Sequence, residues 1–219
     1  MADFTTEKER QRQRFTTIVL TDVVPRGDSL PLFLPTETPD NQRSSLTRAA
    51  EFLTVCATST ICIIDNQGPS RPGYPGAEAW IRVLKDLRVE REHISLVPFD
   101  GQLLTTLTEA FSMVELAQKR SWKGLIVLAP EFHLVRCVLS IITAIIKLGA
   151  DLQVFAQVGT RLPLYEADVE HSQTRRFKDR SDIPGLELES IEKYMTTGTP
   201  VPLVSYAEAL AYLRQRDTR

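Results

Sequence analysis

The chain has 219 residues, of which 42% are hydrophobic and 25% charged, a composition typical of a folded domain that excludes a disordered, collagen-like or coiled-coil chain. Its 26 Lys and Arg nearly balance its 28 Asp and Glu, so the net charge of −2 offers no basic field to a nucleic acid. Three cysteines are too few for a disulfide framework and favour a reducing, cytoplasmic location. No apolar run approaches the roughly 20 residues that span a bilayer, so we expect neither a membrane anchor nor export.

The first residues are polar, and residues 1–14 are predicted to form a flexible, charged arm. Residues 15–20 are a short β-branched run that predicts the first strand, which would end next to Asp22. Residues 23–41 contain four prolines, each lacking a backbone donor, and predict a long loop. The α/β domain is therefore expected to start at residue 15.

Helical and strand-like patterns then alternate as far as residue 159. Helices are predicted from residue 45 and at 77–87, 106–119 and 131–148, and strands at 60–65, 94–97, 123–128 and 152–158. Strands that are apolar on both faces and separated by helices form parallel sheets with right-handed crossovers. The sequence thus predicts an α/β fold, with an open, mostly parallel sheet of about five strands and helices on both faces.

The last part of the chain, residues 160–219, is expected to pack on the same domain. Residues 160–183 are polar and predict a loop or a lid, and two helices are predicted at 186–196 and 205–215. Ser205-x-x-Glu208 has the spacing of a capping box. The basic cluster at 175–180 has only Phe177 as a stacking aromatic, so we expect no nucleic-acid partner.

Acidic residues follow the predicted strands. Ligands of open parallel sheets bind beyond the carboxyl ends of the strands, where the sequence places Asp22, Asp65, Asp100, Glu131 and His133. Carboxylates that gather without cations repel, so such a rim implies a bound cation, a hydroxyl-rich ligand or raised pKa values. Alternatively, Asp65 and Asp100 are only turn or cap residues.

His133, Arg136 and Cys137 are spaced to share one face at the start of a helix. A helix N-terminus favours anions, so a neutral His133 beside Arg136 would hold a phosphate or carboxylate, or act as a base. A satisfied structural histidine is the alternative. The apolar residues after Cys137 indicate core rather than a nucleophile, and the cysteines lack the paired spacing of a metal site.

Two further helix starts carry polar residues. Thr106-x-x-Glu109 has capping-box spacing, and Glu78 lies in a first turn, where it complements the helix dipole whether or not it contacts a ligand. The sequence contains no G-x-G-x-x-G, Walker A or G-x-S-x-G pattern, so the motifs of ordinary dinucleotide, P-loop and α/β-hydrolase sites are absent.

The order of these motifs over residues 15–158 resembles the YdcF-like domain family. Glu78-Ala79 precedes a strand, Thr105 to Ala110 opens the next helix, and Phe132-His133-x-x-Arg136 follows a further strand. The resemblance implies a Rossmann-like α/β fold and a nucleotide-like ligand such as S-adenosylmethionine, without a settled reaction.

The chain departs from the family pattern at three places. Asp22-Val23-Val24 stands where the family has a glycine pair, and residues 65–68 replace its Ser-Gly-Gly. In its Thr-x-Glu-Asn motif, Thr108 and Glu109 replace the glutamate and the asparagine. Backbone amides approach a ligand less closely without the glycines, so the chain resembles a divergent member.

Two functions remain open from the sequence. The first is a domain that binds a small anionic or nucleotide-like ligand, with or without catalysis, in which Arg136 holds the anion and His133 transfers a proton. Its site would comprise Asp22, Asp65, Glu78, Asp100, Thr106, Glu109, His133 and Arg136. The second is a non-enzymatic interaction module or homo-oligomeric scaffold, in which the apolar stretch 138–146 faces a partner.

Overall fold

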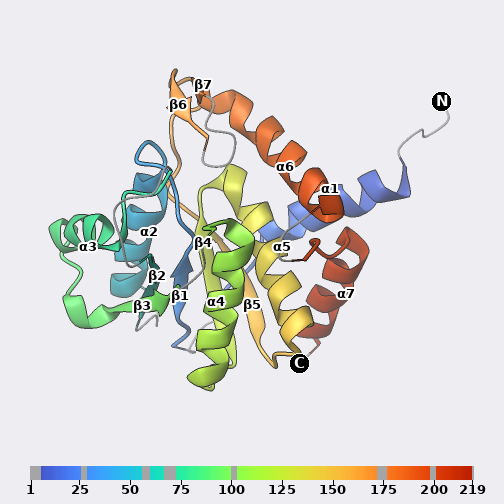
Figure 1. Cartoon of the computed structure of the whole chain (residues 1–219), viewed down its shortest axis with the longest axis horizontal. Helices are drawn as coiled ribbons and strands as arrows, with labels where there is room; N and C mark the ends of the chain where they lie inside the picture. Colours follow the sequence, from blue (N-terminus) through green and yellow to red (C-terminus); the bar gives the residue numbers. More distant parts are fainter. Residues whose placement is uncertain are drawn as a thin grey trace.

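A computed structural model describes residues 6–25, 29–55, 60–66, 73–99, 103–171, 177–197 and 201–218 (Figure 1). Five parallel strands form its main sheet in the order β3-β2-β1-β4-β5. The strands are β1 (Leu32–Leu34), β2 (Ile61–Asp65), β3 (Ile94–Pro98), β4 (Gly124–Ala129) and β5 (Gln153–Val158). The chain runs outward from β1 to β3 and then returns to β4, so the winding direction reverses between β1 and β4. This is the open, Rossmann-like α/β sheet that the sequence predicts.

Helices cover both faces of this sheet (Figure 1). They are α1 (Glu7–Leu20), α2 (Gln42–Val55), α3 (Ala77–Asp86), α4 (Thr106–Lys119), α5 (Glu131–Leu148), α6 (Ile183–Thr197) and α7 (Tyr206–Arg216). Helices α2 and α3 pack on one face, and α1, α4 and α5 on the other. Helices α6 and α7 pack against α5, so the C-terminal helices form an outer layer over that second face.

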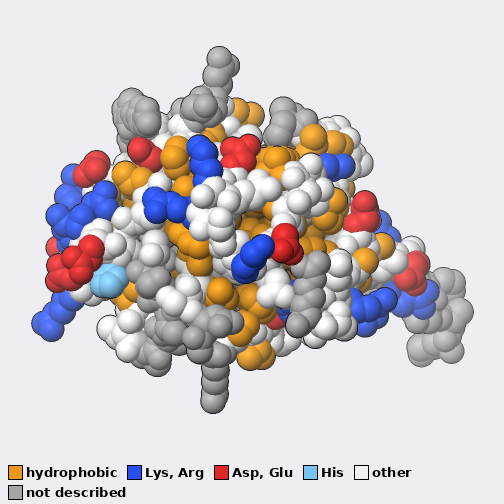
Figure 2. Space-filling model, turned by 90° about the horizontal axis from the view of Figure 1, so that it is seen from below, with side chains coloured by type: hydrophobic (Ala, Val, Ile, Leu, Met, Phe, Trp, Pro, Cys, Tyr) orange, Lys and Arg blue, Asp and Glu red, His pale blue; other side chains and the backbone are white. Residues whose placement is uncertain are grey.

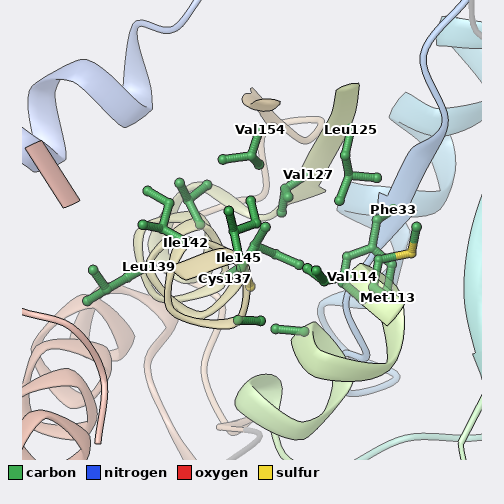
Figure 3. Packing of buried hydrophobic residues seen from close by; sticks show 14 of the residues in the cluster. Phe33, Met113, Val114, Leu125, Val127, Cys137, Leu139, Ile142, Ile145 and Val154 are labelled. Carbon is green, nitrogen blue, oxygen red and sulfur yellow. The ribbon is translucent and has the colours of Figure 1, made fainter. Parts of the chain in front are cut away.

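The larger core surrounds α5, as Figure 3 shows. Cys137 and Ile145 of this helix lie toward Met113 of α4 and Val127 of β4, and Ile142 lies on another side of the helix. The stretch 138–146 is therefore interior: of its apolar residues only Ile146 is exposed, at 41%. The expectation that this stretch faces a partner is wrong, because its own chain covers it.

Residues 15–20 form the second half of α1, so the predicted first strand is wrong. Thr6 and Glu9 make a capping box at the start of α1, and residues 7–14, expected as an arm, continue into the helix. Phe15 and Val19, four residues apart, both point into the core. Helical packing outweighs the β propensity of this run.

The first strand lies inside the segment predicted to be a loop. Leu32–Leu34 runs between Pro31 and Pro35, so the prolines bound the strand instead of interrupting its ladder. Phe33 belongs to the core on one face, and Leu32 and Leu34 to the core on the other. A strand of three residues is too short to give a periodic signal, yet it is the central strand of the sheet.

The predicted loop at 160–183 contains a two-stranded antiparallel ribbon of β6 (Val169–Glu170) and β7 (Phe177–Lys178). Arg180 is fully buried and donates hydrogen bonds to Asn41 and to the backbone oxygens of Pro163 and Asp40. It anchors the ribbon to the chain after β1. Arg175 and Arg176 lie outside the described residues.

The face opposite α6 mixes both signs of charge with hydrophobic side chains (Figure 2). Among the described helices, none is long and apolar enough to cross a membrane.

Candidate functional site

Glu37 and His133 meet at the point where the winding of the sheet reverses. Glu37 follows β1, and His133 lies in the first turn of α5, directly after β4. The Nδ1 atom of His133 lies 2.8 Å from Oε1 of Glu37, and both side chains are 1% exposed. Crevices at such reversal points are where open α/β sheets bind ligands. The carboxylate of Glu37 fixes the orientation of the imidazole.

Arg136, one turn further along α5, is held by Glu187 of α6. Its Nε and Nη2 atoms donate to the two carboxylate oxygens at 2.5 and 2.9 Å, and Nη1 donates to Oγ1 of Thr106 at 2.5 Å. Nε2 of His171 lies 2.9 Å from Oε1 of Glu187. The guanidinium fork is therefore occupied by a carboxylate of the same chain.

Glu109 of α4 completes the buried set on the side of β1. Its carboxylate accepts hydrogen bonds from the backbone nitrogen of Thr36 at 2.8 Å and from the Thr36 hydroxyl. Burial raises the pKa of Glu109, although these hydrogen bonds and the charges of His133 and Arg136 lower it in part. The protonated carboxyl is therefore favoured more than in an ordinary glutamate.

The pKa values of His133 and Glu187 shift in opposite directions. Burial and Arg136 lower the pKa of His133, but Cys137, with Glu187, raises it well above its ordinary value. Burial raises the pKa of Glu187, but Arg136, His133 and His171 lower it far below the ordinary range. The protonated imidazole of His133 is therefore favoured more than that of an ordinary histidine.

Cys137 is 1% exposed and contacts the imidazole of His133 through its sulfur. Burial raises the pKa of the Cys137 thiol, while His133 and Arg136 lower it in part. The thiol is enclosed by core side chains (Figure 3). These surroundings favour an inert thiol, as the sequence indicated.

One carboxylate oxygen of this buried set lacks a hydrogen-bond donor among the described residues. Oε2 of Glu37 is buried and has no hydrogen-bond partner among the described residues. A buried carboxylate oxygen without a donor is costly, and such atoms occur where a ligand, water or ion supplies the donor. Among the same residues, no three His, Cys, Asp or Glu side chains are grouped so that they could hold a metal ion.

Two cavities adjoin the start of α5. One has a volume of about 310 Å³ and lies at the carboxyl ends of β4 and β5, between Ser44, Pro130 and Gly159. The other, of about 400 Å³, lies between α1, α5, α6 and α7. Phe132 lines both cavities, and Glu187 lines the larger one.

The structure brings together four of the eight residues predicted to form the site: Thr106, Glu109, His133 and Arg136. Asp65 ends β2 nearby. Burial raises the pKa of Tyr74, and the charges of Glu109 and Asp65 raise it further, so this ring lies near both carboxylates. The hydroxyl of Tyr74 donates to the backbone oxygen of Ile64 at 3.0 Å.

Of the other three predicted residues, two lie elsewhere. Asp22 follows α1 and pairs with Arg216 of α7 at 2.7 Å, so its expected place at the end of a strand is wrong. Glu78 is exposed in the first turn of α3. Asp100 lies outside the described residues.

The predicted capping box is shifted by one residue. Thr105, not Thr106, is the N-cap of α4, and Thr108, not Glu109, closes the box. This shift frees Thr106 for Arg136 and Glu109 for Thr36.

Sequence reasoning missed three members of the buried set. Glu37 was hidden in the proline-rich segment because β1 was not recognised. Glu187 carries a readable signal, since Ile183, Glu187 and Ile191 are spaced by four residues and place a carboxylate in the middle of an apolar helix face. His171 lies in a segment without a periodic pattern and gives no such signal.

Comparison with known proteins yields no family model and no curated protein that matches the chain. Among solved structures, the chain is similar to a pantothenate synthetase from Thermus thermophilus, with a TM-score of 0.41 and 12% identity over 93% of this chain and 80% of that one. At this level of similarity the functions of the two proteins need not correspond.

Proposed function

We propose that this chain binds a small anionic, nucleotide-like ligand at the carboxyl ends of β1 and β4, and that His133 is the group that donates a proton or hydrogen bond to it. The proposal rests on the unpartnered Oε2 of Glu37, which lies beside His133 at the reversal point of the sheet and has no partner among the described residues. S-adenosylmethionine and other nucleotides are the first ligands to test, because the YdcF-like resemblance implies them.

A purely structural role explains this set less well. A core that only needed to be stable would gain from apolar residues at these positions, because desolvating several charged groups costs more than their attraction returns. Here three glutamates, two histidines and an arginine are buried together: Glu37, Glu109, Glu187, His133, His171 and Arg136. Groups whose pKa values are shifted in opposite directions are typical of sites that move protons.

Each residue has a definite part in the proposal. Glu37 orients the imidazole, and His133 presents its Nε2 atom, which lies 3.4 Å from the Thr106 hydroxyl. Arg136 can bind the anion of a ligand only when Glu187 releases the guanidinium. Because Glu187 lines the larger cavity, a ligand reaches this pair from there.

A thermal-shift panel of nucleotides, S-adenosylmethionine and sugar phosphates tests the proposal. A ligand at about a hundred times its dissociation constant stabilises the protein by about 2.7 kcal/mol, a clear rise in the melting temperature. The shift should disappear in His133→Asn, which keeps a donor for Glu37 but loses the Nε2 position. His93→Asn, at the opposite end of the sheet, is the matched control. A panel without a hit, or a hit that His133→Asn retains, contradicts the proposal.

A further inference from the structure

The larger cavity has the composition of a binding site for an amphiphile. Its volume of about 400 Å³ falls in the range of small-molecule pockets. Four helices form its walls: α1, α5, α6 and α7. Its apolar lining comprises Leu20, Phe132, Val135, Leu164, Leu188 and Ile191.

Two arginines line the same cavity. Arg12 comes from α1, and Arg161 from the segment after β5. Among the described residues neither guanidinium forms an ion pair within 4 Å, and Arg12 acts on an acidic group only through its charge, which lowers the pKa of Glu9. Glu187 also lines the cavity, but Arg136 and His171 hold its carboxylate, and Glu131 is exposed to solvent. The cations of this cavity therefore remain available to a ligand.

A buried hydroxyl is the independent sign of a missing partner. Tyr206 is 2% exposed, lines the cavity, and its hydroxyl makes no hydrogen bond with the described residues. Burial and the charge of Glu192 raise the pKa of Tyr206 to about 12, while Arg12 lowers it, so Arg12 lies near this hydroxyl. A buried hydroxyl without a partner is unfavourable unless a bound group completes it.

We propose that the cavity between α1, α5, α6 and α7 binds a medium-chain carboxylate, with its chain against the apolar wall and its carboxylate at Arg12, Arg161 and Tyr206. The tyrosine hydroxyl donates to the carboxylate, and the two guanidiniums balance its charge. Glu37 and His133 do not line this cavity, although Glu187 does. A carboxylate bound here would therefore compete with a nucleotide that enters by the same route, but its own binding does not require a nucleotide.

Calorimetric titration of the full chain with octanoate and decanoate, below their micelle concentrations, tests this site. Each added methylene should tighten binding by about fourfold, because it buries one more CH₂ group. Decyltrimethylammonium, with the same chain and the opposite charge, should not bind. The proposal is overturned if decanoate does not bind at millimolar concentration, or if the cation binds as tightly as decanoate. It is also overturned if the chain binds only to anionic phospholipid vesicles.

Matched variants locate the site. Arg12→Gln and Arg161→Gln should each weaken decanoate binding by about two- to fivefold, the effect of one partly exposed charge, whereas Arg14→Gln on the exposed side of α1 should leave it unchanged. Thr16→Leu fills part of the cavity and should weaken binding by about tenfold, while Thr17→Leu, on the exposed side of α1, should not. Equal affinities across these pairs, in variants with unchanged melting temperatures, would place the ligand elsewhere.

Discussion

Arg136 and Glu187 join α5 to α6 through side chains that are 1% and 3% exposed. Helix α6 lies across the top of α5 (Figure 1), so the pair ties α6 to the helix that carries His133. Alanine at Arg136 would leave the Glu187 carboxylate buried without its cation. Arg136→Ala should therefore destabilise the fold as well as change the candidate site.

Glu187→Gln should lower the free energy of unfolding by about 3 to 5 kcal/mol, because Arg136 is left as an uncompensated buried charge. Glu189→Gln, an exposed position on the same helix, is the control and should change it by less than about 0.5 kcal/mol. Urea unfolding of both variants measures the difference. Equal midpoints would show that the ion pair does not hold α6 in place.

Glu109→Gln should stabilise the protein at neutral pH. The pKa of Glu109 is raised in the folded state, so its contribution is favourable below the unfolded carboxyl pKa and is lost as the pH rises through the folded value. The amide keeps an acceptor for Thr36 and removes the buried charge. The stability difference between variant and wild type should grow from near zero at about pH 4 towards about pH 8.

Glu115→Gln, exposed on the same helix, is the control for this titration and should show no such trend. A loss of stability in Glu109→Gln at the alkaline end of this range would mean that the ionised carboxylate holds the fold together. A gain would mark Glu109 as a residue that costs stability, which is common at functional sites.

At the scale of elements, residues at the end of α1 and in α7 cover the backbone of β5, which is one of the two edge strands of the sheet. Asp22 accepts a hydrogen bond from the backbone nitrogen of Ala156 at 2.8 Å, and Arg216 donates to the backbone oxygen of Val154 at 2.7 Å. The hydroxyl of Tyr212 bonds to the backbone nitrogen of Val154 and the backbone oxygen of Leu152. Edge strands with unpaired backbone groups invite aggregation. These side chains satisfy backbone groups of β5 that have no neighbouring strand.

Asp22→Ala should therefore act on stability and not on ligand binding. It should lower the free energy of unfolding by about 3 kcal/mol, because Arg216 is 5% exposed and loses its buried partner. Asp217 also pairs with Arg216 but is 57% exposed, so Asp217→Ala should cost less than about 1 kcal/mol. A normal melting temperature for Asp22→Ala would contradict this structural role.

The secondary structure could be predicted from the sequence where an element has its own periodic pattern. It could not be predicted where tertiary packing decides whether a segment is a helix or a strand. The helix at 131–148 and its glycine stop are confirmed, because both the apolar pattern and Gly149, with φ of 60°, are local signals. The segment 15–20 has β-branched residues but is held as a helix by contacts with α5 and α7. The strand Leu32–Leu34 is fixed by its two neighbours in the sheet, which no local pattern reveals.

The same limit applies to the candidate site. His133 and Arg136 could be singled out because they occupy a helix start after a strand. Their partners Glu37, His171 and Glu187 come from three other parts of the chain, and only the topology brings them together.

At the scale of the whole molecule, the sheet separates two apolar cores. Trp80 is fully buried in the core formed with α2 and α3, and Trp122 packs at the border of the core around α5. The two cores share every strand of the sheet, so neither can open without the other. The chain should unfold as one cooperative unit.

The tryptophans report on the two cores separately. Trp80→Phe leaves Trp122 as the only tryptophan of the chain, and Trp122→Phe leaves Trp80. For each variant, urea unfolding is followed both by tryptophan fluorescence and by circular dichroism, which reports the loss of helix. The two transitions should coincide within each variant, whatever the stability change that the substitution causes. Fluorescence that leads or trails the helix signal in one variant would reveal that the two cores unfold independently.

The most direct test of the proposed ligand site is nuclear magnetic resonance of the imidazole nitrogens, because the chain has only three histidines. His133 and His171 belong to the buried set, and His93 lies before β3 at the opposite end of the sheet as an internal control. Adding S-adenosylmethionine or a nucleotide should move the signals of His133 and His171 and leave that of His93 unchanged. If saturating amounts of these compounds move none of the three signals, or move only that of His93, the proposed site is contradicted.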